Sequence, residues 1–170
     1  MFKVHVRRSS CFEIVGEIGQ CLAAGHALER HGQQNPVAGN VEKQLALGGL
    51  DELRGVTIDS DENIRIGSLT SFSHITRDPI IQKYIGVLGE AVDQVGGPQI
   101  RNIGTIGGNT CNGVTSADSA ATLVAYDAAV ELTGAEGVRL VPIREFYIKA
   151  GQVDLRPGEI ETAIRIPRES

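Results

Sequence analysis

One stretch of this chain, residues 97–120, has too little apolar side-chain surface to form an ordinary core helix or strand. It reads GPQIRNIGTIGGNTCNGVTSADSA, holds five glycines, and has no charged residue between Arg101 and Asp118. Hydroxyl and amide side chains fill many of its other positions. A compact protein keeps such a segment where its backbone lies against something polar, because glycine permits a close approach. This stretch is therefore the first candidate for a binding site.

The residue types in this stretch predict a phosphate cradle. Gly107 and Gly108 would expose successive N–H groups, and the hydroxyl of Thr105 would add a donor. The amide of Asn109 would fix the turn, and Asp118 would accept hydrogen bonds from sugar hydroxyls. No Lys follows the glycines and no strand–GxGxxG–helix unit is present, so neither familiar phosphate motif applies. On composition alone, a glycine-rich connecting loop followed by an N-capped helix remains an equally good interpretation.

Length and composition indicate one globular domain, or one and a half small ones, in a chain of 170 residues with 41% hydrophobic and 22% charged side chains. The net charge of −5 argues against nucleic acid or an anionic membrane as a partner. The basic N-terminus lacks the apolar core of a signal peptide. Three widely spaced cysteines, Cys11, Cys21 and Cys111, argue against a disulfide framework or a zinc site, so we expect a cytoplasmic protein without a bound metal.

The apolar periodicity from residue 50 onward predicts a mixture of strands and helices. Strands are expected at 56–58, 64–66, 130–132, 138–140 and 160–166. Helices are expected at 78–85, 88–95 and 117–126, with a helical turn at 143–146. Residues 1–49 have a weaker pattern, with a short strand, one helical stretch and a loop. Because no regular βαβ repeat is present, the predicted class is α+β, with a mixed sheet flanked by helices.

The string RNIGTIGGNTCNG at 101–113, followed by TSADSA, closely resembles the FAD-binding subunit of bacterial xanthine dehydrogenases. That subunit belongs to the molybdenum hydroxylase flavoproteins, which share the FAD-binding fold of vanillyl-alcohol oxidase. The resemblance runs from about Leu50 to Ser170 and includes LDELRGV, RIGSLTSFSHI and LRPGEI. It implies a small N-terminal α/β subdomain at 1–55 and a main FAD-binding subdomain at 56–170.

The resemblance also implies roles for particular residues. The loop that holds the FAD pyrophosphate corresponds to Gly104, Thr105, Ile106, Gly107, Gly108 and Asn109. Asn112 and Asp118 match positions that line the rest of the dinucleotide, and Ile160 matches an apolar position whose backbone lies by the flavin ring. No catalytic acid or base is expected, because flavin redox chemistry belongs to the cofactor.

The function implied by the resemblance is electron transfer within a flavin-dependent oxidoreductase of purine metabolism. An iron–sulfur subunit would pass electrons through FAD to NAD, and the substrate would be oxidised on a separate subunit that carries the molybdenum cofactor. Those two subunits are the expected partners, without nucleic acid or membrane. Because the substrate site lies on another chain, this sequence does not identify the substrate.

Two departures from the family pattern lead to an alternative function. The family's other phosphate loop, Ala-Gly-Gly-Thr-Asp, has its nearest match at Ala23-Ala24-Gly25-His26-Ala27. Gly25 is the one glycine kept and a candidate FAD contact, whereas the double glycine and the hydroxyl–carboxylate pair are missing. Family members also continue past the position of Ser170, so we expect a C-terminally truncated form with an unpaired sheet edge after Ile166. The alternative is a degenerate paralogue that keeps the fold, serves only in assembly and binds no FAD. The flavin subunit of a carbon monoxide or aldehyde dehydrogenase is a third possibility, which CNG and TSADS disfavour.

Three further residues have competing interpretations. Cys111 is expected to be a small buried neighbour of the cofactor rather than a redox thiol or an iron–sulfur ligand. Arg101 would pair with a phosphate or with a carboxylate. His74 is expected to be solvated or hydrogen-bonded rather than catalytic.

Overall fold

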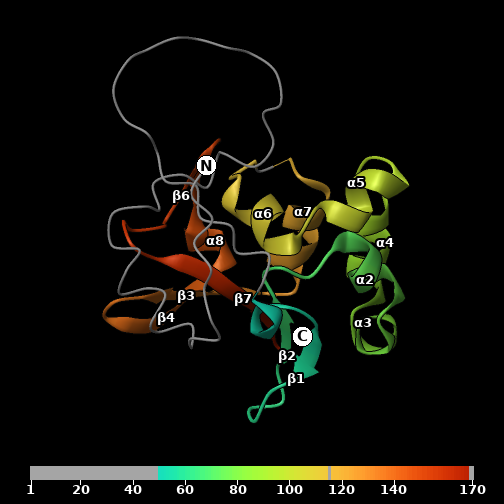
Figure 1. Ribbon diagram of the computed structural model, residues 1–170, viewed down its shortest axis with the longest axis horizontal. Helices are drawn as coiled ribbons and strands as arrows, with labels where there is room; N and C mark the ends of the chain where they lie inside the picture. Colours follow the sequence, from blue (N-terminus) through green and yellow to red (C-terminus); the bar gives the residue numbers. More distant parts are fainter. Residues whose placement is uncertain (1–49, 115, 169–170) are drawn as a thin grey trace.

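The computed structural model describes residues 50–114 and 116–168 (Figure 1). The predictions for residues 1–49, including Gly25 and most of the proposed N-terminal subdomain, lie outside these residues. No described helix is long and apolar enough to cross a membrane.

A five-stranded sheet forms the centre of the described fold. Its strands, in spatial order, are β1 (Val56–Ile58), β2 (Ile64–Gly67), β7 (Ile160–Ile166), β3 (Ala129–Gly134) and β4 (Gly137–Pro142). A separate two-stranded ribbon consists of β5 (Tyr147–Lys149) and β6 (Gln152–Val153). Every described strand pair is antiparallel, so the prediction of a mixed sheet is wrong. The α+β class is confirmed.

Both predicted hairpins are present, and local turn chemistry explains them. In the first, Val56 pairs with Ile66, and the Asp59 carboxylate accepts the N–H groups of Asp61 and Asn63 at 2.9 Å each. This side chain organises the turn, as Asp does in Asx turns. In the second, the pair Gly134–Gly137 closes the β3–β4 turn, and a glycine is needed at 137 because φ there is +115°.

Strand β7 lies in the middle of the sheet, between β2 and β3. The unpaired edge expected after Ile166 is therefore not at this strand, and the edges of the described five-stranded sheet belong to β1 and β4. A β-bulge interrupts the β3–β7 ladder. Glu131 pairs with Ala163 while Leu132 pairs with Glu161, so Thr162 is an extra residue between two pairs.

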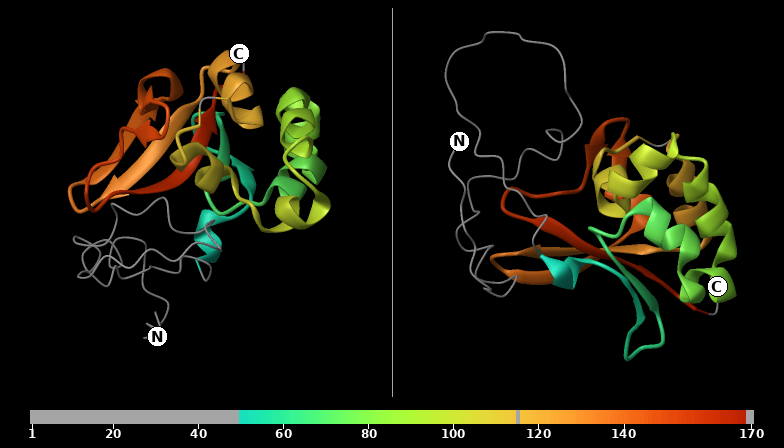
Figure 2. Two further views of the ribbon diagram at one scale, coloured as in Figure 1. Left: turned by 90° about the horizontal axis from the view of Figure 1, so that it is seen from above. Right: turned by 45° about the vertical axis from the view of Figure 1, so that its right-hand side comes forward.

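The helices α2 to α7 gather on one side of the sheet (Figure 2). Helical segments are η2 (Asp51–Leu53), α2 (Phe72–Arg77), α3 (Pro79–Tyr84), α4 (Gly86–Asp93), α5 (Pro98–Ile103), α6 (Ile106–Cys111), α7 (Asp118–Ala125) and α8 (Ile143–Phe146). The predicted helices correspond to α3, α4, α7 and α8. Asp78 starts α3 as expected, because its carboxylate accepts the N–H groups of Ile80 and Ile81. The stretch interpreted as a loop instead contains α5 and α6.

The core lies between the sheet and these helices. Alternate strand residues, including Ile66, Val130 and Ile164, are fully buried against Leu88 and other helix side chains. Burying a side chain of this size stabilises the fold by roughly 1.5–3 kcal/mol. Because strand side chains alternate between faces, the intervening residues point to the other face. That face carries an ionic network centred on Glu131, Arg65 and Arg165.

Candidate functional site

Helix α6 is the centre of the candidate site, and a bridge to α2 fixes its start. Thr105 has extended backbone and pairs with Ser71. The N–H of Ile106 donates to the carbonyl of Thr70 at 3.0 Å, and the N–H of Phe72 donates to the carbonyl of Gly104 at 3.1 Å. Neighbouring segments therefore hold this helix in place, rather than a long apolar face of its own.

Gly107 is required by internal packing. Its N–H donates to the carbonyl oxygen of Ser68 at 3.0 Å. A Cβ atom at this position would lie 2.5 Å from Cβ of Ser68, closer than real Cβ atoms approach. The prediction that Gly107 and Gly108 expose successive N–H groups is wrong, because the next N–H, from Gly108, donates to the hydroxyl of Thr105 at 3.2 Å.

The solvent-facing groups of this region are side chains. Gly108 is exposed, and the Thr105 hydroxyl that caps it still has its own proton to donate. Asn109 accepts a 2.6 Å hydrogen bond from the buried Ser119, which ties α6 to α7 and leaves the Asn109 NH₂ group free. Among the described residues, neither Asn112 nor Asp118 has a side-chain partner. The site thus offers hydroxyl and amide donors and one carboxylate.

The structure brings most of the predicted site residues together on α6, on α7 and between them. Ile160, at the start of β7, is 3% exposed and pairs with Thr133. Because of the bulge, its side chain points to the face opposite the helices, and its neighbour Glu161 points toward α6.

A buried acidic cluster beneath α6 was not identified from the sequence. Glu161 is 6% exposed, and its carboxyl oxygens accept hydrogen bonds from Ser68 Oγ at 3.3 Å and from Cys111 Sγ at 3.1 Å. Burial raises the pKa of Glu161 to about 8, although these two hydrogen bonds oppose the shift. Burial, together with Glu161, also raises the pKa of the Cys111 thiol well above its usual value. Cys111 is a partly buried thiol that is hydrogen-bonded to the carboxyl group of Glu161.

Tyr147 adds a third titratable group to this cluster. Its pKa is raised to about 12, first by burial and then by the proximity of Glu161 and Cys111. Its hydroxyl oxygen is buried and has no hydrogen-bond partner among the described residues. The nearby Thr110 hydroxyl donates its proton to the carbonyl of Ile106 at 2.8 Å.

Arg101 and His74 each pair with a carboxylate. Arg101 pairs with Asp93 at 3.2 Å and donates to the carbonyl of Gly96 at 2.6 Å, so it binds a carboxylate and closes the α4–α5 turn. His74 is exposed and lies 3.4 Å from Asp78, as expected for a solvated histidine.

The sequence matches the family described as FAD binding domain in molybdopterin dehydrogenase over residues 19–169. The chain belongs to this family. It is 48% identical over 118 residues to the putative xanthine dehydrogenase FAD-binding subunit XdhB of Escherichia coli K12, covering 69% of this chain and 40% of that protein. It is 33% identical over 157 residues to the carbon monoxide dehydrogenase medium chain of Afipia carboxidovorans, covering 90% and 52%.

Solved structures of FAD-family relatives confirm the fold. The chain resembles carbon monoxide dehydrogenase from Oligotropha carboxidovorans with a TM-score of 0.66 and 36% identity, covering 69% of this chain and 41% of that one. For the enzyme from Hydrogenophaga pseudoflava the TM-score is 0.68 at 32% identity, covering 72% and 42%. The chain spans about half or less of the length of these relatives.

The residues around α6 fit the FAD of this family in part. Hydroxyl and amide donors on Thr105, Asn109 and Asn112 suit a pyrophosphate, and a free carboxylate on Asp118 suits ribose hydroxyls. The exposed Gly108 leaves room for close approach. Backbone N–H groups of the first turn do not contribute, because other parts of the chain already accept them.

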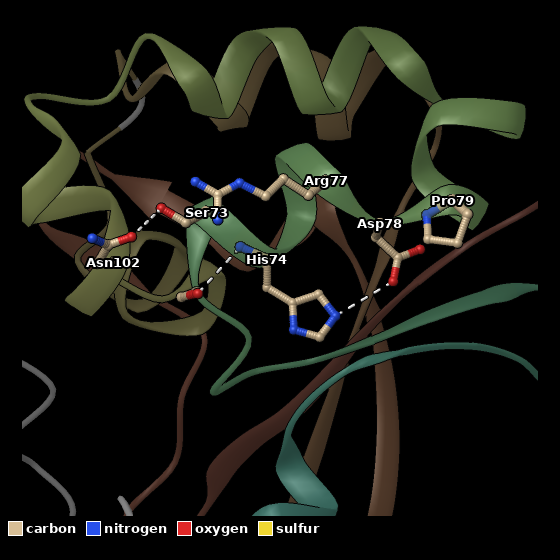
Figure 3. Close-up of a pocket in the computed structure, with 7 residues that line it drawn as sticks. Ser73, His74, Arg77, Asp78, Pro79 and Asn102 are labelled. Atoms are coloured by element: carbon tan, nitrogen blue, oxygen red, sulfur yellow. Dashed lines mark hydrogen bonds and ion pairs between the residues drawn. The ribbon is translucent and has the colours of Figure 1, made fainter.

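A separate surface hollow of about 450 Å³ lies on the α2 side of the Ser71–Thr105 bridge (Figure 3). Ser73 donates to Asn102 at 2.6 Å there, and His74 faces Asp78. None of the residues matched to FAD binding lines this hollow. Within residues 50–114 and 116–168, no group of three or more His, Cys, Asp or Glu side chains could hold a metal ion.

Proposed function

We propose that this chain binds FAD and forms the FAD-binding part of a xanthine dehydrogenase-like molybdenum hydroxylase, a flavin-dependent oxidoreductase. The observation that carries the proposal is the set of polar groups on and after α6 that have no partner among the described residues, in a chain 48% identical to a putative xanthine dehydrogenase FAD-binding subunit. FAD would supply the redox chemistry, and the protein would bind and orient it.

Within the site, each group has a distinct task. The Thr105 hydroxyl and the amides of Asn109 and Asn112 donate to the pyrophosphate. Gly108 permits the phosphate oxygens to approach, and Asp118 accepts from ribose hydroxyls. The side chain of Ile160 points to the sheet face opposite α6. The backbone of β7 at this residue would lie near the flavin ring.

The complete enzyme would pass electrons from an iron–sulfur subunit through FAD to NAD. The family description, which places the domain in molybdopterin dehydrogenases, supports a partner that carries the molybdenum cofactor. The iron–sulfur subunit and NAD enter the proposal through the resemblance to the xanthine dehydrogenase type.

Spectroscopy of the purified full chain tests FAD binding. Uptake of added FAD, with a flavin absorbance that remains after gel filtration, is expected. Asn112→Ala should weaken binding about tenfold or more, because a hydrogen bond to a charged group contributes about 1.5–3 kcal/mol. Asn102→Ala, in the hollow of Figure 3, is the matched control and should leave the affinity unchanged. A chain that takes up no FAD contradicts the proposal.

The assembly-only paralogue remains the second candidate. It is favoured by one observation, that the first-turn N–H groups of α6 are bound within the protein and not available to a phosphate. It predicts that the chain associates with molybdenum or iron–sulfur subunits without containing flavin. Recovery of neither subunit in a pull-down would contradict it.

A further inference from the structure

Glu161 connects the parts of the chain that position α6. One carboxyl oxygen accepts from Ser68, whose own carbonyl accepts the N–H of Gly107 in the first turn of α6. The other accepts from Cys111, the last residue of the helix. A single side chain on β7 is thus linked to both ends of the six-residue helix proposed to hold the FAD pyrophosphate.

Among residues 50–114 and 116–168, no positively charged side chain contacts this carboxyl. The groups around it are Cys111 from α6, Ser68 from the segment after β2, Tyr147 from β5 and the apolar Leu132 opposite it on β3. The two titratable neighbours, Cys111 and Tyr147, are neutral at physiological pH because their pKa values are raised. An ionised carboxylate here would lack a counter-ion, so the neutral acid is the stable form.

We propose that Glu161 is a positioning residue for the FAD site, which holds α6 in place as a neutral acid and couples FAD binding to its own protonation. The inference rests on the proposed function. It adds a titratable group that no resemblance assigned to the site.

The direction of the coupling follows from charge. Ionised Glu161 would repel the pyrophosphate proposed to bind at α6. The cost of burying its charge would also loosen the contact of α6 with β7. FAD therefore binds the protonated form more tightly, and by linkage bound FAD keeps Glu161 protonated to higher pH. Above the free protein's pKa of about 8, the affinity should fall by up to about tenfold per pH unit.

The test measures the FAD Kd of the full chain below and above pH 8. Wild type should bind progressively less tightly above that pH, whereas Glu161→Gln should show a Kd that does not change with pH. Glu136→Gln, at the exposed β3–β4 turn, is the matched control and should keep the wild-type profile. Cys111→Ser and Tyr147→Phe test the other titratable groups. A wild-type profile in Glu161→Gln, or its loss in Cys111→Ser alone, overturns the proposal.

Infrared spectroscopy without FAD gives an independent measurement. At neutral pH the chain should show the carbonyl-stretch band of a buried protonated carboxyl group, and Glu161→Gln should lack it. Absence of the band overturns the inference whether or not FAD binds. A chain that shows the band but takes up no FAD at any pH contradicts the proposed function, and the coupling with it.

Discussion

Glu131 and Glu161 lie on neighbouring strands of one sheet and are buried to almost the same extent, with 5% and 6% of their surface exposed. Glu131 points away from the helices, and Arg65 and Arg165 contact it at 2.9 and 2.7 Å. Glu161 points toward the helices, and its hydrogen bonds within the described part of the chain come from a hydroxyl and a thiol. Two buried glutamates on opposite faces of the same sheet thus have opposite partners.

This difference shows that partners, not burial alone, set the charge of a buried carboxyl. Burial acts to raise the pKa of Glu131, but hydrogen bonds from Arg65, Arg165 and Thr162 lower it below the usual value. Glu161 has no such cation among the residues that the structure describes, and burial raises its pKa to about 8. At neutral pH one face of the sheet therefore holds a carboxylate and the other a carboxylic acid.

The largest expected effect is a two-sided pH dependence of stability. Folded Glu161 keeps a proton that the unfolded chain releases near pH 4.5, so its own contribution to stability is fully present below that pH and is lost as pH rises toward about 8. The slope is up to about 1.4 kcal/mol per pH unit. Folded Glu131 has a lowered pKa, so its contribution is present above pH 4.5 and is lost in acid.

Urea unfolding at a series of pH values separates the two contributions. Glu161→Gln should remove the loss of stability between about pH 4.5 and 8, and Glu131→Gln should reduce the loss of stability in acid. An unchanged loss between pH 4.5 and 8 in Glu161→Gln would show that this carboxyl is ionised at neutral pH, and the contrast between the two faces would then disappear.

The same substitution at both sites should differ most in cost at neutral pH. Glu131→Gln leaves Arg65 without its counter-ion and Arg165 with Asp59 alone, and should destabilise the fold by about 3 kcal/mol. Glu161→Gln replaces one neutral group by another of similar shape and needs no proton uptake on folding, so it should not destabilise the fold and should raise its stability at neutral pH. The free energy of unfolding in urea measures both, and equal costs would contradict the assigned charge states.

Gly107 tests the packing on the Glu161 side. Gly107→Ala would drive a methyl group into Ser68, the partner of both α6 and Glu161, and should cost about 2 kcal/mol. Gly108→Ala is the control, because Gly108 is exposed and its nearest neighbour is the Thr105 hydroxyl at 3.1 Å. We expect a change below about 0.5 kcal/mol there, since helix propensity offsets the contact. Thermal unfolding with no difference between the two variants would show that α6 moves freely against Ser68.

The smallest expected difference concerns one hydroxyl beside each glutamate. Thr162 donates to the charged Glu131 at 2.8 Å, and Ser68 donates to the neutral Glu161 at 3.3 Å. Hydrogen bonds to charged groups contribute more, so Thr162→Val should cost about 2 kcal/mol and Ser68→Ala about 1 kcal/mol. A reversed order in urea unfolding would contradict the comparison.

Local signals in the sequence were sufficient for much of the fold. Alternating apolar residues predicted both hairpins, and Asp78 followed by Pro79 predicted the start of α3. Helices α5 and α6 were missed because their residues lack an apolar period. Contacts distant in sequence, such as the Ile106–Thr70 hydrogen bond, hold them instead.

The candidate site was predictable only in part, for the same reason. The motif located Thr105, Asn109 and Asp118, but nothing in the sequence showed that the N–H of Gly107 is bound to Ser68. Simple alternation places Glu161 on the face of Arg165. The bulge at Thr162 reverses that phase and turns Glu161 beneath α6. A bulge depends on the pairing of two distant strands, which this single sequence does not reveal.

The central position of β7 also bears on how the protein is made. Its pairing with β2 joins Ile166 to Ile64, roughly a hundred residues earlier in the chain. At about 5–20 residues per second, a ribosome would need on the order of 5–20 s to deliver β7 after β2. During that time the inner edge of β2 has no partner and is open to pairing with other chains. Co-translational folding of this sheet is therefore limited by the synthesis of its central strand.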